Sequence, residues 1–240
     1  MTHSNDGSKP PEQTPEAFPG NSLRPSRGGG VPAIVVPIRS LGVNHRGRIA
    51  SHLLSLEPQD RYLRFGFGAS DEHVQRYVDG LDLARDEVFG IYNRTLKLIA
   101  MAHLAFPAKM TELTTAEFGV SVLKSARGRG YGARLFERAC MHARNDGITH
   151  MVIHALSENT AMLRIARTAG AVVTRDGPES EARLRLPQAT LDTRITEIVQ
   201  EQLAQFDYHF KQRAHHFRKV LTLLQADKAT TTSPPPSRDA

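Results

Sequence analysis

The residues best suited to chemistry in this chain lie in one basic, glycine-rich segment, Ser121–Gly132, with the sequence SVLKSARGRGYG. An apolar stretch typical of a strand precedes it, and a stretch with one apolar helical face follows. Amides at a helix start lack partners within the helix, and the helix dipole favours negative charge beside them. Glycines lack a Cβ atom, so backbone there can approach a ligand closely. With the fixed charges of Arg127 and Arg129 alongside, the turn predicts binding of a pyrophosphate-bearing cofactor.

The charge of the chain is consistent with an anionic ligand. The 240 residues carry a net charge of +6, and 21 basic and 16 acidic residues fall within residues 33–187, so the excess is not in a tail. A length of 240 residues suits one domain with extensions. A domain with this excess of positive charge attracts anions, and nucleic acid is an alternative to a small anionic ligand. No block of lysines interleaved with aromatic residues supports that alternative, so nucleic acid is not among the predicted partners.

Nothing in the sequence indicates a membrane or an oxidising compartment. No apolar run approaches the ~18 residues of a membrane span. The N-terminal residues MTHSNDGSKPPEQTPE lack the charged-then-apolar pattern of a signal peptide. The single cysteine, Cys140, excludes an internal disulfide, and we interpret it as a packing residue on an apolar helical face. We therefore predict a cytoplasmic protein.

Apolar periodicity and turn residues predict a series of elements before the glycine turn. Residues 1–32 are rich in Pro, Gly, Ser and Thr and are predicted to be disordered. The predicted elements are a strand at Ala33–Ile38, a helix from Asn44 to Leu56 ended by Pro58, a helix capped by Asp71 and extending to about Leu83, and a hairpin of Glu87–Tyr92 and Leu96–Phe106.

The elements around and after the turn alternate strands with helices. The strand Ala116–Leu123 places Phe118, Val120 and Val122 on one side and Glu117, Gly119 and Ser121 on the other. Beyond the helix that follows the turn, the predicted elements are a strand at His150–Leu156, a helix at Glu158–Ala169 capped by Ser157, and strands at Ala171–Thr174 and Ala182–Leu186.

One long helix is predicted for Leu191–Gln225, within a C-terminal segment of residues 188–227. Its apolar seam is mixed in the middle, which allows two interpretations. The first is a helix that lies back over the domain, which we favour, and the second is an arm that forms a homodimer. Residues 228–240 are predicted to be a disordered tail.

The order of these elements, with RGRGYG after the fourth strand, resembles the GNAT superfamily of N-acetyltransferases. Arg127, Gly130 and Gly132 match the family motif R/Q-x-x-G-x-G/A, and Asn159 opens a helix that ends at Gly170, as in the second family signature. The resemblance spans residues 33–187. It implies an α/β (α+β) GNAT fold, in which helices flank a central mixed, mostly antiparallel sheet.

Two segments are similar to the catalytic domain of bacterial protein-lysine acetyltransferases, the type that modifies acetyl-CoA synthetase. They are SLEPQDRYLRFGF at Ser55–Phe67 and ENTAMLRIARTAG at Glu158–Gly170. The resemblance implies acetyl-CoA as co-substrate, with its diphosphate on the turn, and its pantetheine arm beside a fourth strand that separates from the fifth. Asn159 is then close to the pantetheine, or is only a polar residue at a helix start. The implied binding residues are Val120, Val122, Leu123, Arg127, Gly128, Arg129, Gly130, Tyr131, Gly132 and Asn159.

Acetyl transfer to an amine requires the neutral amine, and a lysine with a pKa of ~10.4 is almost entirely protonated at neutral pH. A carboxylate near the cleft can accept that proton. Glu117, about ten residues before the turn, is the candidate base, where the family often has one; the alternative is a surface glutamate. Glu112 and Glu158 are weaker candidates. No HExxH motif or cysteine pair indicates a metal ion, and we interpret His150 and His154 as structural.

The chain departs from the family at two positions. Ala166 stands where many members carry a tyrosine that protonates the leaving thiolate, and Ala171 replaces a usual aromatic residue. The general acid is therefore unassigned. The first hypothesis is an N-acetyltransferase acting on a primary amine, either a protein lysine or a small molecule, by direct attack in a ternary complex. The alternative is a non-catalytic acetyl-CoA-binding sensor that acts through its C-terminal helix.

Overall fold

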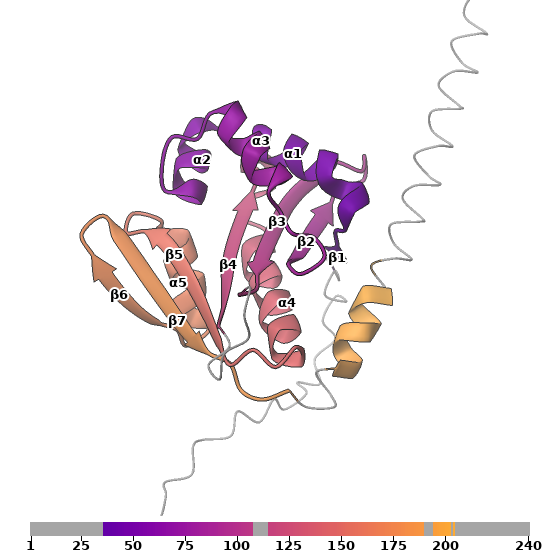
Figure 1. Ribbon diagram of the computed structural model, residues 1–240, viewed down its shortest axis with the longest axis vertical. Coiled ribbons are helices and arrows are strands. Elements are labelled where there is room, and N and C mark those ends of the chain that lie inside the picture. The colour runs from indigo at the N-terminus through magenta and orange to yellow at the C-terminus, as the bar shows by residue number, and fades with distance from the viewer. Residues whose placement is uncertain (1–35, 108–114, 190–193, 203, 205–240) are drawn as a thin grey trace, which may run out of the picture. The chain divides into compact units, whose positions relative to one another are not determined.

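The computed structural model describes residues 36–107, 115–189, 194–202 and 204, all within a unit that begins at Val36. In this part of the chain, strands form a mixed sheet in the order β1-β2-β3-β4-β5-β7-β6 (Figure 1). Only the pair β4 and β5 is parallel, and the other neighbours are antiparallel. The expected mixed, mostly antiparallel sheet is confirmed. The strands are β1 (Arg39–Ser40), β2 (Glu87–Tyr92), β3 (Leu98–Ala105), β4 (Thr115–Val122), β5 (His150–Leu156), β6 (Val172–Asp176) and β7 (Glu179–Arg185).

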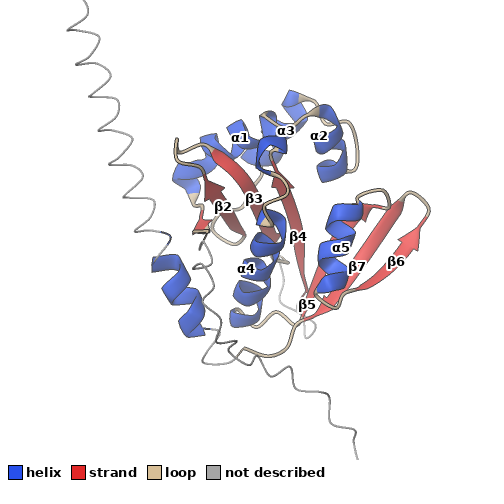
Figure 2. Cartoon of the chain, turned by 180° about the vertical axis from the view of Figure 1, so that it is seen from behind, coloured by secondary structure: helices blue, strands red, loops and turns tan. Residues whose placement is uncertain are grey.

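Helices cover both faces of the sheet (Figure 2). Phe118 of β4 packs edge-on against Phe136, with ring centroids 5.0 Å apart, which places α4 on one face. Ser121 alternates with Phe118 along β4 and points to the other face, where its hydroxyl is hydrogen-bonded to His52 of α1. The predicted alternation along this strand is therefore confirmed. The helices are α1 (Arg46–Leu54), α2 (Pro58–Phe65), α3 (Asp71–Asp79), α4 (Tyr131–Asn145) and α5 (Thr160–Thr168), with short 3₁₀ turns at Val43–His45 and Lys124–Ala126.

The first third of the chain differs most from expectation. Pro58 does not end a helix; it occupies the first turn of α2, a helix that the sequence analysis missed. Proline is favoured there because its missing N–H would have no partner in any case. The predicted strand Ala33–Ile38 is also wrong where it can be compared, since residues 36–38 form no strand and β1 begins at Arg39.

Two predicted helix caps are displaced by one or two residues. The Ser70 side chain, not that of Asp71, accepts a hydrogen bond from the His73 amide and caps α3. Similarly Asn159, not Ser157, caps α5 by accepting from the Met162 amide. In both cases the capping residue has an extended or turn conformation, which frees its side-chain oxygen to bond to an amide in the first helical turn.

The helical stripe after the glycine turn packs as predicted. Leu135, Phe136 and Ala139 are at most 2 % exposed. The Cys140 Sγ atom lies 3.9 Å from the sulfur of Met151, and burial raises the pKa of this thiol to about 12. A thiol held neutral in this way is a weak nucleophile, which agrees with a packing role.

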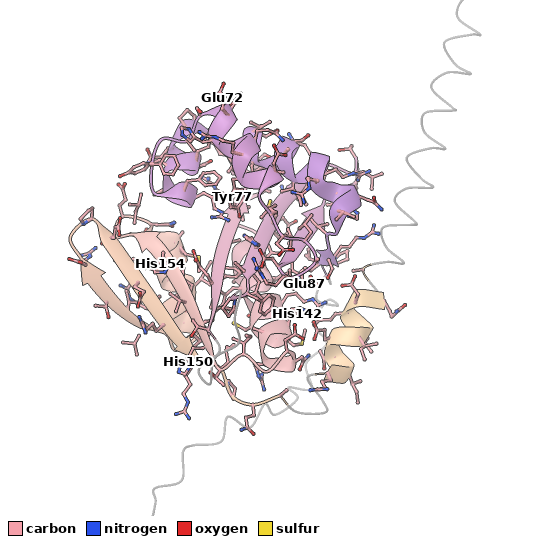
Figure 3. All side chains as sticks on the ribbon, viewed as in Figure 1. Glu72, Tyr77, Glu87, His142, His150 and His154 are labelled. Atoms are coloured by element: carbon pink, nitrogen blue, oxygen red, sulfur yellow. The ribbon has the colours of Figure 1, made fainter. Side chains whose placement is uncertain are left out.

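Residues 194–202 are helical and contact α4 through charged side chains. Arg138, buried on α4, lies 2.9 Å from Glu197 and 3.2 Å from Glu201. Although burial opposes it, the hydrogen bond to Glu197 raises the pKa of His142, which also lies near Glu87 of β2 (Figure 3). This start of the predicted C-terminal helix therefore lies against the domain. Most of that helix, and the predicted tails 1–32 and 228–240, lie outside the described residues.

In the described ranges, no helix is both long enough and apolar enough to cross a membrane.

Candidate active site

The site lies where β4 and β5 separate. These parallel strands pair only through Thr115–Glu117 and His150–Val152, although each strand continues beyond that point. Figure 1 shows the two strands diverging from their shared end. The separation leaves strand edges without sheet partners on both sides, and buried backbone polar groups require partners. Such edges can bind a ligand that carries amide groups, in the way that an added strand would.

One cavity, of about 410 Å³, extends from this gap to the glycine turn. We call it the cofactor cavity. Eight of the ten predicted binding residues line it, and they are Val120, Val122, Arg127, Gly128, Gly130, Tyr131, Gly132 and Asn159. Leu123 does not line it: the residue is buried and its amide bonds to the Ile99 carbonyl. Arg129 is exposed on the turn and also does not line it.

The glycine turn presents open backbone to this cavity. Gly128 and Gly130 have φ angles of +74° and +73°, and a Cβ atom built on either would meet nothing within 4 Å. Gly130 is the N-cap of α4, and the first amide to bond back into the helix is that of Arg134. The preceding amides of the first turn therefore have no partner within the helix. This arrangement suits a diphosphate.

Gly132 has a second role that the sequence analysis did not anticipate. A Cβ atom at this position would lie 3.2 Å from Cδ1 of Ile165 on α5. The glycine thus allows α4 and α5 to pack closely beside the cavity, in addition to exposing backbone.

Two ion pairs connect the α2 segment to the glycine turn. Asp60, 8 % exposed, pairs with Arg127, and Glu57 at the N-terminus of α2 lies 3.0 Å from Lys124. The second Asp60 oxygen, Oδ2, is buried without a hydrogen-bond partner among the described residues. The sequence analysis did not identify Asp60, because α2 itself was not predicted.

Asn159 connects the same helix to α5. Its oxygen accepts from the Met162 amide at 3.2 Å, and its Nδ2 lies 3.4 Å from the Leu63 carbonyl oxygen on α2. Both alternatives given for this residue are therefore compatible with its position, since it caps a helix and lines the cofactor cavity. Ala166 is fully buried and does not line the cofactor cavity.

A second and larger cavity, of about 930 Å³, opens on the other side of the gap. We call it the acceptor cavity. Glu117 lines it, away from the glycine turn. Four acidic residues line it against two arginines, so the lining is acidic in a chain whose net charge is positive. The carboxylates belong to Glu117, Asp176, Glu179 and Glu181, and the guanidinium groups to Arg64 and Arg183.

The acceptor cavity also contains polar residues that the sequence analysis did not identify. They are Tyr77 of α3 (Figure 3) and His103 of β3. His154 of β5, interpreted above as structural, also lines the cavity. Arg64 lies over β4, with its guanidinium group where a side chain at Gly119 would be. In the part of the chain that the structure describes, no group of three His, Cys, Asp or Glu side chains could hold a metal ion.

Comparison with known proteins identifies the class. Residues 52–171, half of the chain, match the family model described as the Acetyltransferase (GNAT) family. The chain belongs to this family and is an acyltransferase. None of the curated proteins matches the sequence.

Solved structures share the fold at low sequence identity. The GNAT domain of S. lividans PAT matches with a TM-score of 0.53 and 21% identity, covering 62% of this chain and 89% of that one. A putative acetyltransferase from Acinetobacter baylyi matches with a TM-score of 0.53 and 17% identity, covering 65% and 95%. An acetyltransferase of the GNAT family from Streptococcus pneumoniae has values of 0.51 and 12%, covering 64% and 100%.

Proposed function

We propose that this protein is an N-acetyltransferase that moves the acetyl group of acetyl-CoA to a primary amine by direct attack in a ternary complex. The observation that carries the proposal is a shared wall between the two cavities. Five residues line both of them, namely Leu63, Arg64, Val120, Asn159 and Met162. Two substrates, one bound in each cavity, would therefore lie next to each other at these shared residues. The acetyl group could then pass directly between them, without a covalent enzyme intermediate.

The cofactor cavity supports acetyl-CoA as the donor. The open amides of the glycine turn and the Arg127 guanidinium would hold the diphosphate, and Arg129 would add charge from outside the cavity. The free edge of β4 at Val120–Val122, with Leu123 fixing its end, would bond to the pantetheine amides. Asn159 would complete the wall near the thioester.

The acceptor cavity supports a cationic substrate. A surplus of carboxylates attracts an ammonium group from solution, and the amine must then lose a proton before it can attack. Glu117 is the proposed base, since it lines this cavity from β4, three residues before Val120 of the shared wall. Such proton transfer typically contributes 100- to 10,000-fold to a rate. A lysine side chain of a protein and a small amine both satisfy these requirements.

The direct test measures binding and turnover separately. Calorimetry with acetyl-CoA should show binding, and free thiol should appear when a lysine peptide or a small diamine is added. A peptide with arginine in place of lysine is the control acceptor and should release no thiol. Binding without transfer to any amine would favour the sensor alternative, and absence of binding would contradict both functions.

A further inference from the structure

Three side chains from separate segments form a hydrogen-bonded chain that leads from the lining of the acceptor cavity into the protein. The Tyr77 hydroxyl lies 2.7 Å from Nδ1 of His103, and Nε2 of His103 lies 3.1 Å from Oδ2 of Asp86. Tyr77 and His103 line the cavity, whereas Asp86 is 8 % exposed and lies behind them. The order is therefore hydroxyl, imidazole, carboxylate, leading from the cavity into the protein.

Asp86 and Arg64 together set the direction of these hydrogen bonds. The Asp86 carboxylate accepts, so Nε2 of His103 carries the proton and donates to it, and Nδ1 of the neutral ring is left as an acceptor. The Tyr77 hydroxyl therefore donates to Nδ1. Nη2 of Arg64, which can only donate, lies 2.8 Å from the Tyr77 oxygen and bonds to it from the cavity side.

Asp86 is itself held in place by further donors. Its Oδ1 accepts from the Phe106 amide and from Nε of Arg85, both at 3.2 Å. These donors orient the carboxylate, which can stabilise a positive charge on His103.

The backbone of β4 positions the cavity end of the chain. His103 pairs with Gly119 across the β3–β4 ladder, and the Arg64 guanidinium lies over that glycine. A Cβ atom at residue 119 would be 2.7 Å from Cζ of Arg64. Gly119 thus leaves the space that Arg64 needs to reach Tyr77 beside the shared wall.

We infer that Tyr77, His103 and Asp86 form a proton relay that receives a proton from the acceptor nitrogen during acetyl transfer. This inference rests on the proposed function. An ammonium acceptor loses two protons in the whole reaction, one before attack and one as the amide forms. Glu117 receives the first, and the relay receives the second.

The step balances as follows. The acceptor nitrogen forms a bond to the acetyl carbon, the carbon–sulfur bond breaks, and its electron pair leaves on the thiolate of coenzyme A. The proton on nitrogen passes to the Tyr77 oxygen while the Tyr77 proton passes to Nδ1 of His103. The resulting imidazolium is stabilised by Asp86, and it returns its proton to solvent or to the thiolate as the product leaves.

The surroundings of His103 keep it ready to accept a proton. Burial lowers the pKa of His103 below its ordinary value, and Arg64 acts in the same direction, whereas Asp86 and Glu117 oppose the shift. The imidazole is therefore neutral at neutral pH. Below that pKa the relay is already protonated and cannot accept a proton.

The arrangement of the relay can be tested without any activity. Long-range ¹⁵N–¹H NMR of protein labelled with ¹⁵N-histidine should show the His103 ring protonated on Nε2 at neutral pH. The His103→Gln variant identifies its signals. A ring protonated on Nδ1 would overturn the inference, because it could not accept the Tyr77 proton.

The role in turnover is tested with Tyr77→Phe, which keeps the ring that packs edge-on against Phe65 and removes only the hydroxyl. We expect kcat to fall about 100-fold, with the Kd for acetyl-CoA changed less than twofold. Tyr62→Phe, on α2 outside both cavities, is the matched control and should keep wild-type kcat. A Tyr77→Phe enzyme that keeps kcat within threefold would overturn the relay.

The pH profile separates the relay from a structural effect. The wild-type log kcat should fall at low pH as His103 becomes protonated, and this decrease should disappear in His103→Gln. An unchanged profile in a folded His103→Gln enzyme would contradict the relay alone. A wild-type enzyme that transfers acetyl to no amine would instead contradict the proposed function.

Discussion

The two cavities of this protein are built by different parts of the chain. The cofactor cavity includes open backbone: two glycines at positive φ, the amides of the first turn of α4 and the edge of β4. The acceptor cavity is lined by residues of α2, α3, β3, β4, β5, α5, β6 and β7. In the proposed function, backbone groups would hold acetyl-CoA, which does not vary, whereas side chains would determine which amine is accepted.

Two histidines that pack against the sheet, one away from both cavities and one at the acceptor cavity, differ in their hydrogen bonds. Under β4, Nδ1–H of His52 donates to the Leu98 carbonyl at 3.0 Å, and the Ser121 hydroxyl donates to Nε2 at 2.8 Å. His103 carries its proton on the other nitrogen and opens onto the acceptor cavity. His52 is 1 % exposed and lines neither cavity, so it stabilises the fold, whereas His103 can exchange protons with a ligand.

The largest expected effect concerns the acceptor cavity. Glu117→Gln should lower kcat about 100-fold or more, since it removes the base while conserving size. Binding of acetyl-CoA, measured by calorimetry, should not change. Glu137→Gln on the exposed surface of α4 is the control and should have wild-type turnover. Turnover that persists unchanged in Glu117→Gln would remove Glu117 from the mechanism.

The contrast between the histidines predicts a pH effect on stability. Burial lowers the pKa of His52 from its ordinary value of 6.5 to about 4. The unfolded chain therefore binds a proton at this residue below pH ~6.5 while the folded chain does not. Above pH ~6.5 this difference in proton binding does not lower the free energy of unfolding. As the pH falls to 4, it lowers the free energy of unfolding by about 3 kcal/mol.

Urea unfolding of wild type and His52→Asn between pH 4 and pH 7 measures this difference. The variant should be less stable at pH 7, and its stability should depend less on pH. Equal pH dependence in the two proteins would show that His52 is not held neutral by the fold.

The cofactor cavity is tested at a backbone position. Gly130→Ala should weaken acetyl-CoA binding about tenfold, because a residue with a Cβ atom loses about 1–2 kcal/mol in holding the left-handed backbone that presents the turn's amides to the cavity. Gly147, at the end of α4, has a similar φ of +79° and lines neither cavity. Gly147→Ala should therefore cost similar stability and leave the Kd for acetyl-CoA unchanged. Equal losses of affinity in both variants would contradict a diphosphate site at the turn.

The smallest expected effect comes from charge beside the turn. Arg127→Gln should weaken acetyl-CoA binding about fivefold at low salt, and Arg129→Gln, outside the cavity, should weaken it less. The difference should shrink in 1 M salt, where screening shortens the reach of charges to about 3 Å. Calorimetry at two salt concentrations measures it, and a larger effect of Arg129 would place the diphosphate outside the cofactor cavity.

Features formed by neighbouring residues could be predicted from the sequence, whereas features formed by distant residues could not. The glycine turn and the strand before it are local features, so eight of ten proposed binding residues could be placed from spacing and do line one cavity. The relay joins residues 26 and 17 positions apart, and only the sheet register and the packing of α3 bring them together. The helix α2 was missed because Pro58 was interpreted as a stop, although it also favours a helix start.

That short helix has a consequence for how the enzyme would take up its substrates. Through Asp60 it contacts the glycine turn, and through Leu63 and Arg64 it forms part of both cavities. A diphosphate that draws Arg127 away from Asp60 would shift the same element that shapes the acceptor side. Thermodynamic reciprocity then requires that an amine alter the affinity for acetyl-CoA by the same factor by which acetyl-CoA alters the affinity for the amine.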